Sequence, residues 1–392
     1  MFSHLKIFVS KIEYLATGSG FFLLGFLFGN WATLIPYIKD YFALSDATLG
    51  LLLLCLPFGA MTFNPFAAKL IQKFGLKVMV RFGMLYIPFA YFFPFLVSSL
   101  YLLPLTLIMV GVSMTILNIS INMMATTLEK KYSQLIMATC HGLFSIGLMI
   151  GSLMRSVTLL FEVNEVIHMM CMAIIALILV AWAVQKVMRF PIETESTLKQ
   201  KADVDHKTKF SLPHGILLYI VLVSICINFT EGSMTDWASV YMDDVVKTSK
   251  YFIGWGLFGY SFFMALGRLF GDGIIPVLGR NKVLSYGAML TFIGIFIVIA
   301  FPTTFLSILG FGLVGLGVSC GAPILYSSAT RIKGMTGEKG LATMNFYAMG
   351  GFLGGPVIIG FISDLSNLSM AFGSVMILAT IWFVIGSKVD LP

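Results

Sequence analysis

The sequence predicts an all-α membrane protein of twelve transmembrane helices, arranged as two six-helix bundles related by pseudo-two-fold symmetry. Hydrophobic residues make up 58% of the 392 residues and charged residues 11%, whereas a soluble domain carries about 25% charged residues. Apolar stretches of about 20 residues recur along the chain, which is the length that a helix needs to cross a bilayer. These stretches do not alternate between apolar and polar residues, as the strands of a membrane barrel do.

One long polar segment divides the chain into an N-terminal bundle at 1–188, a cytoplasmic linker at 189–212 and a C-terminal bundle at 213–392. The first apolar stretch is too long and too aromatic for a cleaved signal peptide, so we expect it to remain as a span. We expect spans at 14–37, 47–68, 77–97, 101–127, 136–160, 166–188, 213–236, 250–270, 282–301, 303–327, 340–363 and 367–387.

Basic residues gather in alternate loops and in the central linker. By the positive-inside rule, both termini and the linker are therefore expected to be cytoplasmic. The net charge of +7 comes from these loops, so it does not predict a nucleic-acid partner. The five cysteines lie within apolar stretches, without the spacing of a metal site or a disulfide framework, and we expect neither a metal nor a cofactor.

The second half of the chain repeats features of the first half at an offset of about 204 residues. The matching positions are Trp31-Ala32 with Trp237-Ala238, Gly50 with Gly254, Gly111 with Gly317, His141 with Asn345, Gly147 with Gly351, and Gly151 with Gly355. Their shared order indicates a parallel repeat, which is common in transporter folds.

Two loops resemble the signature motif of the major facilitator superfamily, which has a Gly, an Asp-Arg pair, and a further Gly with basic residues. The loops read Ala68-Lys-Leu-Ile-Gln72-Lys73-Phe74-Gly75-Leu-Lys77 and Gly267-Arg268-Leu-Phe-Gly271-Asp272, the latter followed by Gly279-Arg280-Asn-Lys282. In the family, charge pairs in these loops latch the cytoplasmic side. The resemblance implies gating roles for Lys73, Arg268 and Asp272, although Ala68 and Gln72 replace the usual Gly and Asp.

Within that superfamily, the chain resembles a bacterial group of inner-membrane carriers distantly related to the fucose and hexose proton symporters. The resemblance is carried by Leu117-Asn118-Ile-Ser-Ile-Asn122, His141-Gly142-Leu-Phe-Ser145-Ile-Gly147, Glu231-Gly-Ser-Met-Thr-Asp236-Trp237 and Gly350-Gly351-Phe-Leu-Gly354-Gly355-Pro356. It implies a multi-pass protein of the bacterial inner membrane. Fucose-type symporters rely on carboxylates in spans one and four, where this chain has Asn30, Asn118 and Asn122, so the proton site is not carried over.

Two carboxylates lie in the seventh apolar stretch, where a charge is costly and usually marks a substrate or ion pathway. Glu231 falls about 27 Å along the expected helix, in the outer half of the span. Because leaving water favours the neutral form of a carboxyl group, Glu231 is our first candidate for a coupled proton. Gly232 would let the helix bend, and Asp236 is expected near the outer surface, where the helix ends and either meets water or joins the pathway.

Polar residues of spans four, five and eleven are candidates for substrate binding. Asn118 and Asn122 are four residues apart, so they share a helix face and either bind a solute or bond to a neighbouring helix. His141 titrates near neutral pH, so it either carries a proton, bonds a solute or bonds a neighbouring helix. Asn345 occupies the position that matches His141 in the second half.

Four further residues complete the candidates for substrate binding. Asn30 lies in the part of the first half that is equivalent to the region of Glu231. Trp31 and Trp237 either stack on a sugar ring or belong to the interfacial belt of the membrane. Arg155 lies deep in an apolar stretch and either reaches to the outer surface or holds an anionic group of the substrate.

Charged residues at the cytoplasmic ends of spans four and ten are candidates for a gate. Glu129 lies beside Lys130, and Arg331 lies near Glu338. These residues either form the ion pairs of a gate or belong to solvated loop faces.

The pattern favours a secondary transporter that works by alternating access and takes up a small polar solute with protons, as a monomer in the lipid. One alternative is a proton-antiport exporter of amphipathic compounds, but such exporters usually carry Pro in the Gly-rich part of span five, and this chain does not. The other is a membrane sensor. We find no nucleotide-binding loop, no metal-ligand cluster and no nucleophile-base pairing, so we expect neither an ATP-driven pump nor an enzyme.

Overall fold

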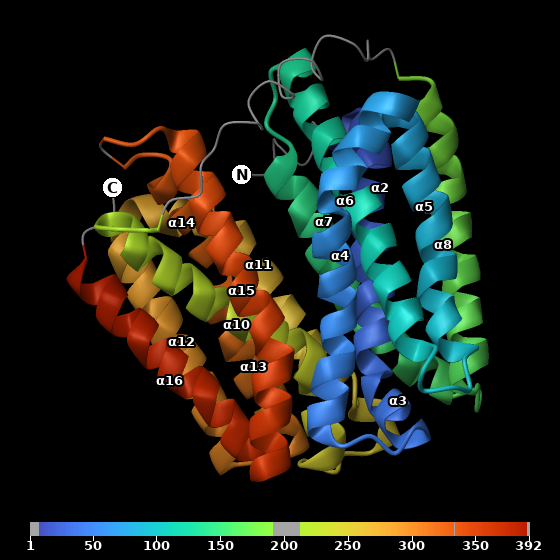
Figure 1. The fold of residues 1–392 in the computed structure, drawn as a ribbon, viewed down its shortest axis with the longest axis vertical. Helices are drawn as coiled ribbons and strands as arrows, with labels where there is room; N and C mark the ends of the chain where they lie inside the picture. The colour runs from blue at the N-terminus through green and yellow to red at the C-terminus, as the bar shows by residue number, and fades with distance from the viewer. Residues whose placement is uncertain (1–7, 191–211, 333, 390–392) are drawn as a thin grey trace. The chain divides into compact units, whose positions relative to one another are not determined.

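The computed structural model describes residues 8–190, 212–332 and 334–389, and these residues form α-helices joined by short turns (Figure 1). The helices are α2 (Ile12–Thr33), α3 (Ile35–Tyr41), α4 (Asp46–Phe74), α5 (Leu76–Phe92), α6 (Leu103–Tyr132), α7 (Met137–Leu159), α8 (Glu165–Met188), α10 (Ile216–Asp244), α11 (Trp255–Leu278), α12 (Arg280–Ala300), α13 (Thr304–Val318), α14 (Gly321–Ala329), α15 (Gly337–Leu365) and α16 (Leu368–Lys388). Within the described ranges, twelve helical segments are long and apolar enough to cross a membrane. The predicted all-α class and its twelve spans are confirmed.

Two of the spans are each built from two α-helices. Ile12–Tyr41 consists of α2 and α3, and Thr304–Ala329 consists of α13 and α14. A proline follows each break, where its ring removes a backbone donor and clashes with the carbonyl four residues earlier. Pro36 lies in the first turn of α3, and Pro323 lies in the first turn of α14.

The seventh span is longer than the sequence predicts. We expect it to end at residue 236, but α10 continues without a break to Asp244. The residues that follow Asp236 are apolar or small and are buried from Trp237 to Met242, so nothing in them stops the helix. The expectation that Asp236 lies at the helix end is therefore wrong, because this residue lies inside the helix and is buried.

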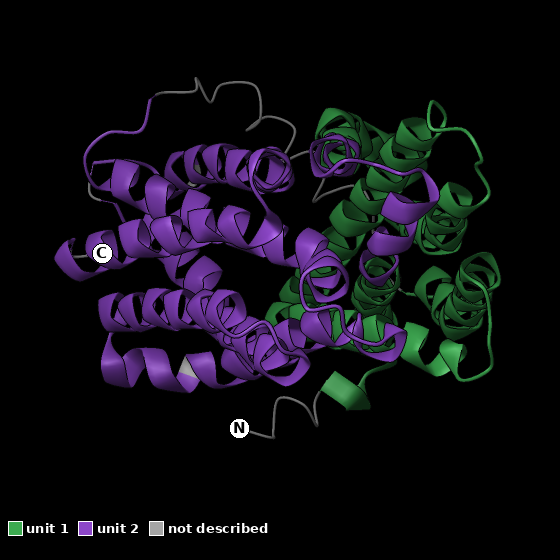
Figure 2. Cartoon of the chain, turned by 90° about the horizontal axis from the view of Figure 1, so that it is seen from below, with its two compact units in different colours: residues 1–31, 55–207 green, residues 32–54, 208–392 purple. Residues whose placement is uncertain are grey.

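By its contacts, the chain divides into two compact units, which Figure 2 shows in different colours. Unit 1 comprises 1–31 with 55–207, and unit 2 comprises 32–54 with 208–392. The predicted N-terminal bundle and unit 1 differ at 32–54, because α3 packs against α10 and this segment groups with the second half. Most of the predicted linker lies outside the described residues, and the division into bundles at 1–188 and 213–392 stays a prediction.

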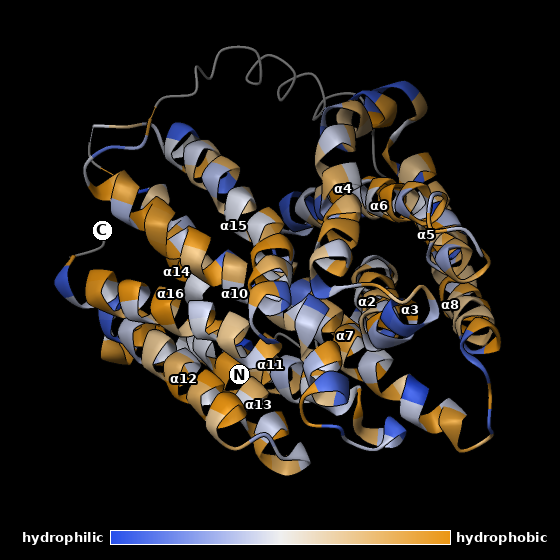
Figure 3. Cartoon of the chain, turned by 60° about the horizontal axis from the view of Figure 1, so that its bottom comes forward, coloured by the Kyte–Doolittle hydropathy of each residue, from blue (hydrophilic) through white to orange (hydrophobic). Residues whose placement is uncertain are grey.

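Apolar residues cover the helices along most of their length, as Figure 3 shows by hydropathy. Many of them are exposed, including Phe66 on α4 and Val277 on α11. A water-soluble protein would bury most of these side chains, whereas a lipid-facing surface is apolar because hydrocarbon surrounds it. This is the surface of a multi-pass membrane protein.

Matching glycines bring equivalent helices close together in the two units. A Cβ atom added at Gly147 or Gly151 of α7 would lie 2.2 Å from a backbone oxygen of α2, and one added at Gly351 of α15 would lie 2.5 Å from a backbone oxygen of α10. The oxygens met in unit 1 belong to Phe22 and Phe26, and those met by Gly351 and Gly355 in unit 2 belong to Ile225 and Phe229. The repeat is therefore present in the packing, with an offset of 203 residues between α2 and α10.

The offset of 203 residues between these contacts on α2 and α10, which we call the packing register, corrects one match made from the sequence. The Trp31-Ala32 and Trp237-Ala238 pairs are offset by 206 residues, three more than the packing offset. In the packing register Trp31 corresponds to Met234, and Asn30 corresponds to Ser233. The shared Trp-Ala dipeptide does not mark equivalent positions.

We expect Gly147→Ala to lower the stability of the protein by about 1–3 kcal/mol, because its methyl group would overlap the Phe22 carbonyl. Gly142 on the same helix has no neighbouring atom within 4 Å of an added Cβ, so Gly142→Ala serves as the matched control. Thermal unfolding in detergent, followed by circular dichroism, measures both. Equal melting temperatures of the two variants would show that the helices do not approach as closely as the structure places them.

Candidate functional site

An ion pair lies within the spans of unit 2, between Glu231 on α10 and Arg268 on α11. The Oε1 atom of Glu231 and the Nη2 atom of Arg268 are 3.7 Å apart, and the two side chains are 23% and 27% exposed. This Oε1 atom is buried and accepts no hydrogen bond from the described residues. The two charges compensate each other where water is scarce, but their distance exceeds the roughly 2.7–2.9 Å of a direct charge-assisted hydrogen bond. The contact is a loose ion pair.

Two tyrosines lie close enough to this pair for its charges to act on their hydroxyl groups. They are Tyr260 on α11 and Tyr326 on α14. Tyr260 is fully buried and its hydroxyl bonds to none of the described residues, whereas Tyr326 is 45% exposed. Glu231 and Arg268 therefore belong to a polar cluster that has unused hydrogen-bonding capacity.

Gly232 lies inside α10, and its predicted role in bending the helix stays a prediction. The helix passes through this position without a break. An added Cβ atom at Gly232 would lie 3.2 Å from the backbone oxygen of Phe352, so the glycine allows α15 to approach α10. Its role in this structure is helix packing.

Asp236 is a second carboxylate of α10, and it lies one and a half turns beyond Glu231. Its exposure is 8%, and the structure gives it neither a hydrogen bond nor an ion pair with any described residue. The sequence predicts that Asp236 lies at the end of the helix, where its carboxylate would be exposed to water. Asp236 is buried because α10 continues past it to Asp244.

In unit 1, Asn30 belongs to a buried hydrogen-bond network that also includes His168 and Thr158. The Asn30 Nδ2 atom donates to the Phe26 carbonyl at 2.8 Å, and its Oδ1 atom lies 3.1 Å from the His168 Nε2 atom. His168 Nδ1 lies 2.8 Å from the Thr158 hydroxyl. Asn30 and His168 are both fully buried, so the Asn30 carboxamide bonds within unit 1 in this structure.

His168 is not among the residues that the sequence predicts for the site. The signal was a histidine inside the apolar sixth span, where a polar side chain needs a partner. Because Asn30 uses its amide group as a donor to Phe26, its Oδ1 atom is the acceptor, and the Nε2 atom of His168 carries the proton between them. The imidazole fixes α8 to α2.

Arg155 bonds to its own unit. Its Nη2 atom lies 2.5 Å from Oε1 of Glu165, and its Nη1 atom donates to the Val163 carbonyl at 2.6 Å. The guanidinium therefore closes the turn between α7 and α8. The predicted contact between Arg155 and an anionic substrate stays a prediction. In this structure the Arg155 side chain holds the turn between α7 and α8.

Asn118 and Asn122 lie on one face of α6, as their spacing predicts. The Nδ2 atom of Asn122 donates to the Oδ1 atom of Asn118 at 2.7 Å and to its backbone oxygen at 2.8 Å. Asn118 is exposed and Asn122 is partly exposed. The pair presents amide groups at the surface of its helix, where they can reach another molecule.

His141 on α7 and Asn345 on α15 are exposed on matching helices of the two units. The His141 ring meets Phe21 edge-on, with 5.2 Å between the ring centroids. The two residues are 204 positions apart, close to the offset of the glycine contacts. Each unit therefore places one exposed polar residue at this point of the repeat.

Trp31 and Trp237 are core residues. They are 1% and 0% exposed, and Trp31 packs against Phe95. Neither lies in an interfacial belt or presents a face that could stack on a solute in this structure. The large apolar rings stabilise the interior of their units.

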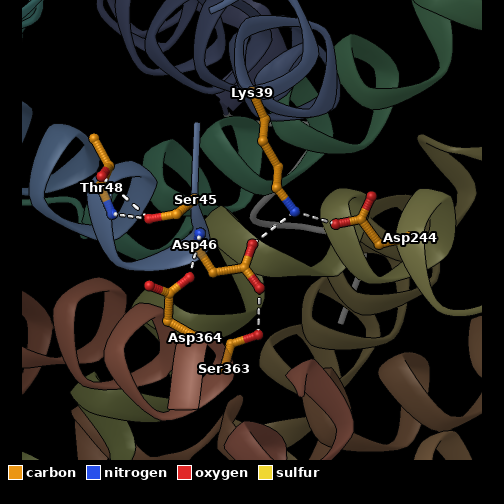
Figure 4. Close-up of polar contacts among 7 residues, drawn as sticks. All are labelled: Lys39, Ser45, Asp46, Thr48, Asp244, Ser363 and Asp364. Carbon is orange, nitrogen blue, oxygen red and sulfur yellow. Dashed lines mark hydrogen bonds and ion pairs between the residues drawn. The ribbon is translucent and has the colours of Figure 1, made fainter. Parts of the chain in front are cut away.

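A cluster of charged residues in unit 2, centred on Lys39, was not predicted (Figure 4). Lys39 Nζ lies 2.6 Å from an oxygen of Asp46 and also pairs with Asp244. The Asp46 backbone N–H donates to Asp364 at 3.1 Å, and the Ser363 hydroxyl donates to the Asp46 carboxylate. These contacts join the end of α3 and the start of α4 to the ends of α10 and α15.

The predicted gate residues take different places. Glu129 accepts hydrogen bonds from the backbone N–H groups of Ile136 and Met137, at 2.7 and 2.8 Å, and so holds the start of α7. Lys73 and Arg331 are exposed. The side chain of Asp272 lies outside the described part of the chain, and Arg268 reaches Glu231. A gating role for these residues stays a prediction.

The chain is similar to known membrane proteins over nearly its whole length. The family model described as Major Facilitator Superfamily matches residues 17–249. An uncharacterized MFS-type transporter of Yersinia pestis is 31% identical over 366 residues, which cover 93% of each chain. The membrane protein MosC of Rhizobium meliloti is 25% identical over 390 residues, which cover 95% of this chain and 90% of MosC.

Solved structures of transporters share the fold. The nucleoside transporter NupG matches with a TM-score of 0.71 at 13% identity, covering 97% of this chain and 100% of NupG. The transporter FucP, in its outward conformation, matches with a TM-score of 0.59 at 18% identity, covering 95% of this chain and 97% of FucP. At such identities the likeness shows the fold alone.

We expect His168→Leu to destabilise the protein by about 1–3 kcal/mol, because it removes both hydrogen bonds of the buried imidazole, to Asn30 and to Thr158. His141→Leu is the matched control, since His141 is exposed on its helix. Thermal unfolding of the purified variants measures the difference. A His168→Leu variant as stable as His141→Leu would show that the buried network contributes nothing.

Proposed function

This chain belongs to the Major Facilitator Superfamily of membrane transporters, and we propose that it takes up a small polar solute, such as a sugar or a related metabolite, together with protons. The resemblance noted in the sequence is confirmed by the family model and by the relative of 31% identity. We place the protein in the bacterial inner membrane, as a monomer with both termini cytoplasmic, because its basic loops favour that orientation. It works by alternating access.

The observation that carries the proposal is the Glu231–Arg268 pair inside the spans. Glu231 is stable as a carboxylate while Arg268 compensates its charge, and it loses that attraction when it takes up a proton. A single proton thus changes the contact between α10 and α11. A group that couples proton binding to helix movement needs this property, and the 3.7 Å distance leaves the pair able to open.

Exposed amide and imidazole groups support a hydroxyl-bearing substrate. Asn118, Asn122, His141 and Asn345 can donate and accept hydrogen bonds, and each is exposed or partly exposed on its helix. Among the other candidates, Asn30 and Arg155 bond to their own unit and the tryptophans are buried, so we assign them supporting roles.

The names of two structural neighbours agree with this substrate class. FucP is described as the E. coli fucose:proton symporter, and NupG as a nucleoside transporter. Fucose and nucleosides both carry several hydroxyl groups. We extend this only to the class of solute, a small molecule rich in hydrogen-bonding groups.

We assign the cluster around Lys39 to a gate on the outer side of the membrane. The proposed topology places the ends of α3, α10 and α15 on that side, away from the basic loops. Lys39 bonds two carboxylates on different helices, so breaking its contacts frees both ends together.

We expect Glu231→Gln to abolish accumulation of the solute driven by an inward proton gradient, because the amide cannot take up or release the coupled proton. Exchange of the solute without a gradient should survive, since the binding groups are unchanged. Uptake and exchange of labelled solutes in membrane vesicles measure both. Glu162→Gln, which removes an exposed carboxylate, is the control and should behave as the wild type.

Unchanged accumulation by the Glu231→Gln variant would show that Glu231 is not the proton-coupling residue, and His141 would then be the candidate. Efflux of amphipathic dyes, with no accumulation of any polar solute, would instead favour the exporter.

A charge exchange tests the gate. We expect Lys39→Asp to lower the initial rate of uptake several-fold, because it sets a third carboxylate beside Asp46 and Asp244. Adding Asp244→Lys to that variant should restore much of the rate. Lys250→Asp changes an exposed lysine and controls for net charge. Failure of the double variant to exceed Lys39→Asp would argue against the pair as a functional contact.

A further inference from the structure

The two carboxylates of α10 lie in different environments. Glu231 has a positive charge 3.7 Å away and a side chain that is 23% exposed. Asp236 is 8% exposed and has no ion pair or hydrogen bond among the described residues. Where two titratable groups have such different surroundings, one is suited to hold a charge and the other to hold a proton.

The surroundings of Asp236 contain hydroxyl groups but no compensating charge. Ser233 and Ser239, one turn before and after it, are fully buried, and neither hydroxyl bonds to a described residue. The described Lys, Arg, Asp and Glu side chains on the helices packed against α10 are Lys39, Asp40, Arg268, Lys339, Asp364 and Lys388. None of them forms an ion pair with Asp236.

An ionised carboxylate in such a place is unstable. Moving a charge out of water without a partner costs far more than moving a neutral acid, so the group neutralises itself by taking up a proton. Burial of the neutral acid costs less still when hydroxyl groups flank it, because small rearrangements let them bond to it. Geometry and burial thus favour the –COOH form.

We propose that Asp236 is a proton-carrying residue of the transport cycle, held as the neutral acid in this conformation. The inference rests on the proposed function and adds a second carboxyl group to it. Asp236 and Glu231 are five residues apart, about 7.5 Å along the helix, with Asp236 on the outer side in the proposed topology.

The proton step involves only Asp236 and water. Asp236 gives up its carboxyl proton to water and becomes a carboxylate when the transport cycle opens its surroundings, and it takes up a proton from water before they close again. The step needs no other reactant.

Infrared spectroscopy of the purified full-length protein in lipid tests the inference directly. A neutral carboxylic acid has a C=O stretch that a carboxylate lacks, and the band shifts when H₂O is replaced by D₂O. At pH 7 we expect this band in the wild type, its loss in Asp236→Asn, and its return in Asp236→Glu. Glu231→Gln is the matched control and should keep the band.

Two results would overturn the proposal. One is the absence of the band from the wild type at pH 7, and the other is its persistence in an Asp236→Asn variant. Asp236→Glu keeps the test valid if the Asn variant does not fold, because its longer acid must show a band shifted from that of the wild type. The spectrum needs no substrate, so its failure is separate from a failure of gradient-driven uptake.

Discussion

The absence of water inside a bilayer is the constraint on which this structure depends. A polar side chain within a span must find a partner in the protein or stay neutral. Asn30 is hydrogen-bonded to His168. Arg155 forms an ion pair with Glu165, and Glu231 forms one with Arg268. Each of these contacts also joins one helix to another. Because a polar side chain within a span needs a partner, it helps to determine which helices pack together.

The two units duplicate their packing but not their polar interiors. Asn164 caps α8 and Asn367 caps α16 in the same way, each accepting from the N–H three residues later. Four residues after the cap, unit 1 has His168 and unit 2 has Ala371. Ser233, which corresponds to Asn30 in the glycine register, has no imidazole to meet, and its hydroxyl has no partner in the described residues. The two halves of the repeat share the close contacts between helices but differ in their buried polar residues.

The sequence predicts the class, the number and the approximate bounds of the spans, because each depends on a local run of apolar residues. It also predicts the shared face of Asn118 and Asn122, which follows from helix geometry alone. It fails for Asp236, because the end of a helix depends on what covers the next residues, and Trp237 to Met242 are covered. The sequence does not predict the Lys39 cluster, because Lys39 and Asp244 are 205 residues apart in the chain.

The segment at 32–54 belongs to unit 2 by its contacts, yet it is covalently joined to unit 1 at both ends. Each junction lies beside a proline: Pro36 follows the break between α2 and α3, and Pro57 lies inside α4. Proline removes a backbone hydrogen bond, so these two turns resist bending less than the rest of their helices. The segment therefore joins unit 1 through helix turns that have lost a backbone hydrogen bond, and its ion-paired residues Lys39 and Asp46 lie between those turns.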